Sequence, residues 1–157
     1  MIAELLRESS VPKSVLIVDD HEAIRRELRR LFESQPEFTV CGEAVDGADA
    51  ISKAEQLSPD LVILDLAMPE MNGLEAAGAL RYMLPDARLF LLTAYNNREI
   101  ELAALQQGVH AVFSKYDDLD GLIPRARIEL KLASAGDAES DTESESQGQK
   151  PPDPEEG

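Results

Sequence analysis

Short apolar runs alternate along the chain with segments of helical periodicity. Three of the runs are continuous, and continuous apolar runs of about four residues are typical of strands buried on both faces, as in a parallel sheet covered by helices. The run 38–44 instead alternates apolar and polar side chains, which predicts a strand at the edge of the sheet. The predicted strands are 15–18, 38–44, 61–64, 89–92 and 109–113.

Between and after these runs, apolar side chains recur every three or four residues, which predicts one helix after each strand. Gly108 suits the C-terminal cap of the fourth helix. For the fifth helix we expect Asp118 or Asp120 to cap the start, and Pro124 to lie close to the first turn, where proline costs least. The predicted helices are 24–32, 48–57, 74–80, 100–104 and 119–132.

Alternating strands and helices predict βαβ units with right-handed crossovers. With the second strand at an edge, we expect an α/β fold: a flavodoxin-like (βα)5 doubly wound parallel sheet with strand order 2-1-3-4-5. Ligands of such sheets bind beyond the carboxyl ends of the strands. Candidate chemistry is therefore sought at those ends.

The charge of the chain changes this picture at its C-terminal end. The formal net charge of −16 argues against direct binding to nucleic acid, because phosphate contacts need clustered Lys and Arg. After residue 134, eight acidic side chains accompany the single Lys150, and aromatic residues are absent. Such a segment cannot bury enough apolar surface to offset its ordering entropy. We expect an N-terminal extension over 1–12, one domain over 13–133, and a disordered acidic tail over 134–157.

The sequence gives no sign of a membrane segment or of a disulfide. No apolar run approaches the roughly 20 residues that a membrane helix needs. The stretch 1–13 is charged and lacks the long apolar region of a signal peptide. Cys41 is the only cysteine and cannot form an internal disulfide, which suits a reducing compartment. We therefore expect a cytoplasmic protein.

Reactive side chains stand at four of the five predicted strand ends. The first strand leads to Asp19 and Asp20, the third to Asp65, the fourth to Thr93 and the last to Lys115. Three carboxylates packed at one edge would repel one another and raise their pKa values. A hard divalent cation removes that conflict, and Mg²⁺ needs only a few carboxylates because it keeps several waters.

The same groups suit an acyl phosphate. Asp65, in the centre, can act as a nucleophile toward a phosphoryl donor and form an aspartyl phosphate. Mg²⁺ and Lys115 would neutralise charge on the transferring group, and the hydroxyl of Thr93 would donate a hydrogen bond to a phosphate oxygen. No general base is needed, because a carboxylate is already ionised at neutral pH.

Four sequence blocks carry a resemblance to a known family. VLIVDDHEAIRREL, DLVILDLAMPEMNGLEA, ARLFLLTAY and AVFSK follow one another in order, each at a predicted strand end. Together they resemble the blocks of two-component response-regulator receiver domains, in the branch usually joined to a helix-turn-helix output domain. The resemblance covers about residues 13–133.

The resemblance implies a role for each site residue. Asp65 would be the phosphoacceptor, and Asp20 would bind Mg²⁺ directly, with Asp19 helping through water. The backbone carbonyl of Ala67 would be the third protein ligand. Thr93 would be the switch hydroxyl and Lys115 the phosphate partner. A sensor histidine kinase or a phosphotransfer protein is the expected phosphoryl donor.

Several positions depart from the family pattern. Val112 stands where the family has its switching Tyr or Phe, which leaves open whether Tyr95 or Phe113 replaces it. Tyr116 stands where many relatives have proline. Ala67 and Tyr95 occupy the two variable positions that flank the phosphate, and neither side chain can position an attacking water. This predicts a long-lived phosphoryl group.

The leading hypothesis is a single-domain response regulator whose output is a protein–protein contact, with an unknown target or with a second copy as a homodimer. It would not be an enzyme beyond its own phosphorylation chemistry. A phosphatase of related architecture would place a second acid two residues after the nucleophile, where this chain has Ala67. A degenerate receiver that acts as a phosphorylation-independent interaction module is the alternative that Val112 leaves open.

Two further features have both an ordinary and a functional interpretation. His21, beside the acidic pair, is either an exposed histidine next to the binding edge, which is favoured, or a metal ligand or phosphorelay residue. The arginines of the first predicted helix are either a solvated helix face, which is favoured, or a docking surface for a kinase.

Overall fold

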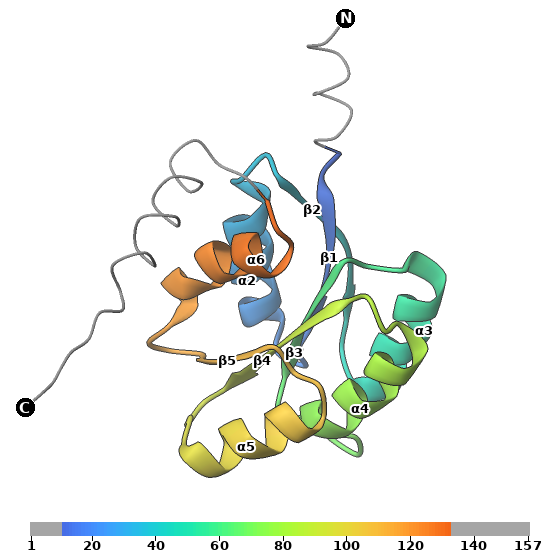
Figure 1. Cartoon of the computed structure of the whole chain (residues 1–157), viewed down its shortest axis with the longest axis vertical. Coiled ribbons are helices and arrows are strands. Elements are labelled where there is room, and N and C mark those ends of the chain that lie inside the picture. The colour runs from blue at the N-terminus through green and yellow to red at the C-terminus, as the bar shows by residue number, and fades with distance from the viewer. Residues whose placement is uncertain (1–10, 133–157) are drawn as a thin grey trace, which may run out of the picture.

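Five short apolar segments pair as parallel strands in the order β2-β1-β3-β4-β5 (Figure 1). The computed structural model describes residues 11–132. The flavodoxin-like strand order predicted from the sequence is confirmed, with β2 at one edge of the sheet and β5 at the other. The strands are β1 (Lys13–Val18), β2 (Phe38–Ala44), β3 (Leu61–Asp65), β4 (Arg88–Thr93) and β5 (Ala111–Ser114).

The helices follow the predicted pattern, except at the last one. A 3-10 turn occupies the first residues of the predicted fifth helix, and the α-helix itself begins at Leu122. Neither Asp118 nor Asp120 caps it, so that expectation is wrong. The Asp118 carboxylate instead accepts a hydrogen bond from the backbone N–H of Ser114, which closes the loop after β5. The elements are α2 (Glu22–Glu33), α3 (Gly47–Leu57), α4 (Gly73–Met83), α5 (Arg98–Gln106), η1 (Leu119–Gly121) and α6 (Leu122–Glu129).

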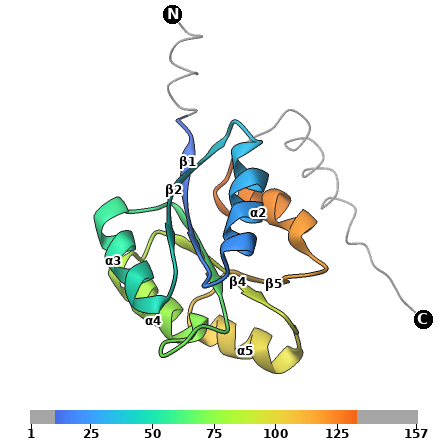
Figure 2. The same ribbon diagram turned by 180° about the vertical axis from the view of Figure 1, so that it is seen from behind.

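The sheet separates two apolar cores. Helices α2 and α6 cover one face, and α3, α4 and α5 cover the other (Figures 1 and 2). Strand β3, in the middle, is buried over its whole length, because its alternating side chains enter both cores. The site that follows β3 therefore rests on the most buried element of the fold.

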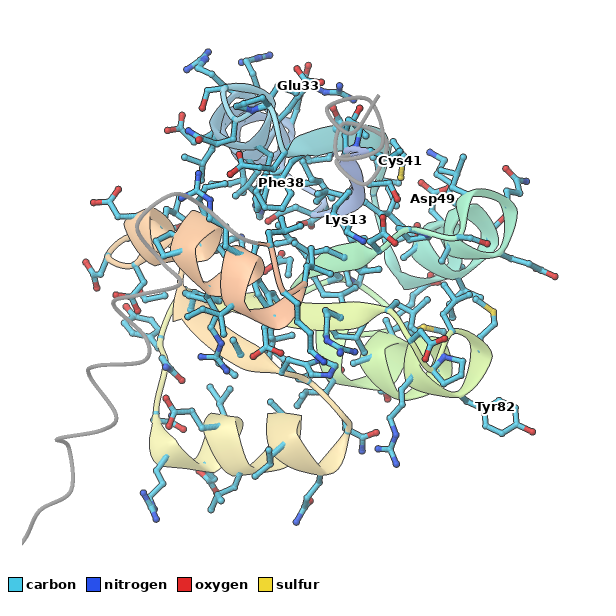
Figure 3. The ribbon with its side chains drawn as sticks, turned by 45° about the horizontal axis from the view of Figure 1, so that its top comes forward. Lys13, Glu33, Phe38, Cys41, Asp49 and Tyr82 are labelled. Atoms are coloured by element: carbon cyan, nitrogen blue, oxygen red, sulfur yellow. The ribbon has the colours of Figure 1, made fainter. Side chains whose placement is uncertain are left out.

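Strand β2 lies at an edge of the sheet, as its sequence predicted, and its burial alternates from Phe38 to Val40. It starts beside β1, with Lys13 paired to Phe38 (Figure 3). The register then shifts by one residue, so that Cys41 is passed over and Ile17 pairs with Glu43. This irregularity places the Glu43 carboxylate near the carboxyl end of β1, where it contacts helix α2.

The predicted N-terminal extension and acidic tail fall almost entirely outside the described residues and stay predictions, as do the domain boundaries at 12/13 and 133/134. Within the described part of the chain, no helix is both long and apolar enough to cross a membrane.

Candidate phosphoacceptor site

The buried polar side chains of the described chain gather at one edge of the sheet. Each of them ends a strand or directly follows one, and the strands are parallel, so all lie at the carboxyl edge. This is the edge at which the sequence placed the candidate chemistry. The buried polar residues within 11–132 are Asp19, Asp65, Thr93, Ser114 and Lys115.

Asp65 is the last residue of the central strand and is only 2% exposed. Its Oδ1 lies 3.2 Å from Nζ of Lys115. Its Oδ2 is buried and has no hydrogen-bond partner among the described residues. Burial, and then the neighbouring charge of Asp19, raise the pKa of Asp65 from 3.8 to about 6, although Lys115 and the backbone N–H of Ala67 act in the opposite direction. Asp65 is thus a buried carboxylate with one uncommitted oxygen.

Lys115 joins the two buried carboxylates. Its Nζ lies 3.0 Å from Oδ2 of Asp19 and 3.2 Å from Oδ1 of Asp65, and the residue is 6% exposed. Burial alone would lower the pKa of Lys115, but the two carboxylates outweigh it and the net effect is a raised pKa. Its backbone N–H donates to the carbonyl of Thr93 at 2.9 Å. The ammonium group is therefore held in place as a charged group.

The turn after β1 presents the remaining acids. Asp19 is fully buried, and its Oδ1 accepts a hydrogen bond of 2.8 Å from the backbone N–H of His21. The imidazole Nδ1 of His21 lies 3.1 Å from Oδ1 of Asp19 and 3.1 Å from Oδ1 of Asp20. The histidine side chain is 63% exposed, so it lies at the edge of the site as expected, while its ring nitrogen contacts both acids.

The donor set fits a divalent cation. Asp19, Asp20, His21 and Asp65 each offer one ligand atom, and these atoms lie within 4.8 Å of one another. The three carboxylates against the one ammonium of Lys115 leave a formal charge of −2 at the site. Oxygen donors with an uncompensated double charge, and a buried Asp65 oxygen without a partner, are what an ion such as Mg²⁺ would satisfy.

Two other predicted site residues are close by but are not joined to the acids by a side-chain contact. The hydroxyl of Thr93 is engaged with the loop after β4: it donates to the carbonyl of Tyr95 at 3.2 Å and accepts from the Tyr95 N–H at 3.3 Å. Ala67 is exposed in the loop after β3. The role of its carbonyl as a ligand stays a prediction.

The loop after β3 is held against the acceptor strand. The backbone N–H of Gly73 donates to the carbonyl of Leu66 at 2.8 Å, and a Cβ at position 73 would overlap the carbonyl oxygen of Asp65. Asn72 and Glu75 form a capping box that starts α4 at this point. The close approach explains why a glycine stands here, and it fixes the backbone on both sides of the acceptor.

The structure excludes Phe113 as a substitute for the switching aromatic residue that the family has at the position of Val112. The two residues are adjacent on β5 and therefore face opposite sides of the sheet. Val112 packs against the core under α3, α4 and α5, whereas the ring of Phe113 packs at a tilt against that of Phe90 in the other core, with 5.3 Å between the ring centroids. Tyr95 is 82% exposed, so its ring has no fixed packing site in this structure.

Sequence reasoning missed Arg25. We expected the arginines of this helix to form a solvated face, but Arg25 is only 15% exposed. Its Nη1 donates to the carbonyl of Asp19 at 2.7 Å, and its Nε donates to the Glu43 carboxylate at 2.9 Å. Arg29 donates to the same carboxylate at 2.7 Å. Arg25 thus links the acidic turn to β2. Its position three residues before buried Leu28, beside the apolar stripe of α2, is the sequence feature that could have indicated its partial burial.

The fold and the site together define a class of protein: a doubly wound α/β domain with a buried aspartate between two acids and a lysine at the carboxyl edge. The chain belongs to the response regulator receiver domain family, whose model matches residues 15–127.

Similar proteins agree with this assignment. The chain is 36% identical over 124 residues to the uncharacterized transcriptional regulatory protein YhcZ of Bacillus subtilis, which covers 77% of the chain and 58% of that protein. It is 32% identical to the receiver domain of the putative response regulator NarL of Mycobacterium tuberculosis, with a TM-score of 0.66 over 74% of this chain and 97% of that one.

A second similar structure is a complex. The CheX–CheY–BeF3–Mg²⁺ complex of Borrelia burgdorferi contains a chain with 26% identity and a TM-score of 0.71, over 77% of this chain and 91% of that one. The predicted branch is also confirmed, because NarL-type regulators are among the relatives. The chain spans about half the length of the curated relatives that it matches.

Proposed function

We propose that the chain is a Mg²⁺-dependent phosphoacceptor, and that Asp65 receives a phosphoryl group from a sensor histidine kinase or a phosphotransfer protein. One observation carries the proposal: Asp65 is buried at the end of the central strand, contacts Lys115 through one oxygen and keeps the other oxygen without a partner. A purely structural carboxylate at such a place would have both oxygens satisfied.

The chemistry follows from the groups around Asp65. A carboxylate oxygen attacks the phosphorus of a phosphohistidine, the O–P bond forms, and the N–P bond breaks with the electron pair going to the imidazole. With a pKa of about 6, Asp65 is mainly ionised at neutral pH and needs no base. A divalent cation held by Asp20, Asp65 and the Ala67 carbonyl, with Asp19 helping through water, would supply positive charge that offsets the phosphoryl oxygens.

Two groups of this chain act on the phosphoryl group after transfer. Lys115, fixed between Asp19 and Asp65, provides a second positive charge at a defined position. The Thr93 hydroxyl exchanges its bonds with the Tyr95 backbone for a bond to a phosphate oxygen. This exchange releases the loop after β4 and links the chemistry to a change of surface.

The output of the switch is a change in protein–protein contact. Phosphorylation biases an existing equilibrium between two surfaces, which a downstream protein or a second copy of the chain distinguishes. The similar CheY chain in complex with CheX, BeF3 and Mg²⁺ supports this form of output. No enzymatic turnover of other substrates is proposed, since Ala67 stands where a phosphatase of related architecture would need an acid.

The second candidate is an interaction module that works without phosphorylation. The observation that favours it is Val112, whose aliphatic side chain is packed in the α3–α5 core and leaves β5 without an aromatic residue on that face. The two candidates differ in whether Asp65 is ever modified.

The test is phosphorylation by a small-molecule donor. The full chain is incubated with acetyl phosphate and Mg²⁺, and its intact mass is measured. We expect one added phosphoryl group, which EDTA and the Asp65→Ala substitution abolish. Asp86→Ala, an exposed acid at the opposite end of the sheet, is the matched control and keeps the adduct. An unmodified wild-type chain would favour the interaction module, and repeated hydrolysis of phosphate esters would favour an enzyme.

A further inference from the structure

The backbone of Asp19 is held on both sides by neighbouring elements. Its N–H donates to the carbonyl of Ala44 on β2 at 3.1 Å. Its carbonyl accepts a hydrogen bond of 2.7 Å from Nη1 of Arg25 on α2. This carbonyl belongs to the planar peptide group that joins Asp19 to Asp20. Arg25 therefore fixes the orientation of the peptide group from which Asp20 starts.

The side chain of Asp20 has little support of its own. It is 34% exposed, and within residues 11–132 its one ion-pair contact is with the ring of His21, which is itself 63% exposed. Asp19, by contrast, is fully buried and contacts Lys115. A metal ligand without firm side-chain contacts depends on its backbone and on the groups that orient it. Asp20 is therefore the acid whose position depends most on the peptide group before it.

Glu43 holds Arg25 in place for this contact. Nε of Arg25 donates to Oε1 of Glu43 at 2.9 Å while Nη1 donates to Asp19, and the arginine side chain is only 15% exposed. A planar guanidinium group can serve two acceptors at once in a fixed geometry, which an ammonium group cannot do. Glu43 is anchored as well, because its backbone carbonyl accepts from Nζ of Lys53 on α3 at 2.6 Å. The acidic turn is thus braced through Arg25 against β2 and α3.

We propose that Arg25 is a positioning residue for phosphoryl transfer. Through the peptide group between Asp19 and Asp20, it holds the Asp20 carboxylate in the direction in which it binds Mg²⁺. This role rests on the ion site of the proposed function and adds a residue that preorganises that site without touching the ion. The positive charge of Arg25 repels a cation. An effect of charge alone would therefore strengthen Mg²⁺ binding when Arg25 is replaced, whereas the loss of positioning weakens it.

The test is a ¹H–¹⁵N NMR titration of the full chain with magnesium chloride. Arg25→Gln should weaken Mg²⁺ binding by about tenfold, the effect typical of losing a residue that orients a metal ligand. Arg29→Gln is the matched control, because Arg29 lies on the same helix and donates to the same Glu43 carboxylate but, within residues 11–132, not to Asp19. It removes the same charge and should change the affinity by less than about threefold. Before Mg²⁺ is added, the ¹⁵N order parameter of the Asp20 amide should fall in Arg25→Gln alone.

Both variants should fold, because each leaves the Glu43 carboxylate one arginine partner. Urea denaturation in EDTA checks this. Arg25→Met keeps the unbranched stem and loses both donors, so it should show the same loss of Mg²⁺ affinity, and it replaces Arg25→Gln if that variant does not fold.

Three results would overturn the positioning role of Arg25 and leave the proposed function standing, because the wild type would still bind Mg²⁺. The first is Mg²⁺ binding in the folded Arg25 variant that is as tight as in the wild type or tighter. The second is an equal loss of affinity in Arg29→Gln. The third is an unchanged order parameter of the Asp20 amide in the folded Arg25 variant. A wild type that does not bind Mg²⁺ would instead overturn the ion site of the proposed function.

Discussion

The substitution Asp65→Asn should stabilise the protein when divalent ions are absent. Burial, and then the charge of Asp19, raise the pKa of Asp65 from 3.8 to about 6. The folded protein therefore holds this proton more tightly than the unfolded chain does. The contribution of Asp65 to stability is fully present below about pH 4 and is lost as the pH rises through about 6. At neutral pH the ionised carboxylate is a destabilising group.

The size of the effect follows from the same pKa values. The difference between 3.8 and about 6 corresponds to about 3 kcal/mol of unfolding free energy. Asparagine has nearly the same shape, carries no charge, and keeps an oxygen that can accept from Lys115. The lysine also retains its 3.0 Å contact with Asp19. We expect Asp65→Asn to be more stable than the wild type by about 2–3 kcal/mol at about pH 7.5.

Urea denaturation followed by circular dichroism, in EDTA and at several pH values, measures this difference. The stability advantage of Asp65→Asn over the wild type should shrink below about pH 6 and vanish near pH 4. Added Mg²⁺ should narrow the gap at neutral pH, because the wild type gains more from the ion than the variant. Asp86→Asn, at an exposed acid, should stay within about 0.5 kcal/mol of the wild type throughout. The reasoning fails if Asp65→Asn is no more stable than the wild type in EDTA at about pH 7.5.

Three further predictions concern the same edge of the sheet. Lys115→Met should lower the unfolding free energy in EDTA by roughly 3–5 kcal/mol, because it leaves the buried carboxylates of Asp19 and Asp65 without a counter-charge. In thermal denaturation, added Mg²⁺ should restore much of the lost stability. A melting temperature equal to that of the wild type in EDTA would contradict this prediction. Gly73→Ala should lower the unfolding free energy measured by urea denaturation by at least about 2 kcal/mol, because the added Cβ would overlap the Asp65 carbonyl. A variant as stable as the wild type would show that the loop shifts to accommodate the Cβ. The isolated phosphorylated protein should lose its phosphoryl group over minutes or longer, and Ala67→Asn should shorten that lifetime by positioning water; decay of the wild type within seconds would refute this.

The sheet and its order were accessible from the sequence because the hydrophobic pattern differs between strand types. The continuous run 61–64 could only be buried on both faces, and the alternating run 38–44 suited an edge. The last strand was placed two residues too early, at 109 instead of 111. Val109 is buried but belongs to the turn after α5, where its N–H donates a hydrogen bond to the Ala104 carbonyl. From the sequence alone, a single buried apolar residue in a turn cannot be distinguished from the first residue of the strand that follows.

The acids and the lysine of the site could be predicted from the sequence because parallel strands bring their carboxyl ends to one edge. The side-chain contacts between elements could not be predicted in this way. Arg25 is recruited by Glu43, whose position depends on the one-residue register shift in β2, and no local pattern reports such a shift. The side of the sheet that Phe113 faces follows from the strand period, but only once the register of β5 is known. The aspartate caps expected for α6 were wrong because a 3-10 turn precedes the helix and Asp118 bonds back to β5.

Asp65 itself should carry the phosphoryl group. The wild-type chain is phosphorylated with acetyl phosphate and Mg²⁺, reduced with borohydride, digested and sequenced by mass spectrometry. Reduction of an aspartyl phosphate yields homoserine, and we expect homoserine at position 65 alone. Homoserine at Asp19 or Asp20, or an unreduced Asp65 in a chain that carries the phosphoryl mass, would contradict it.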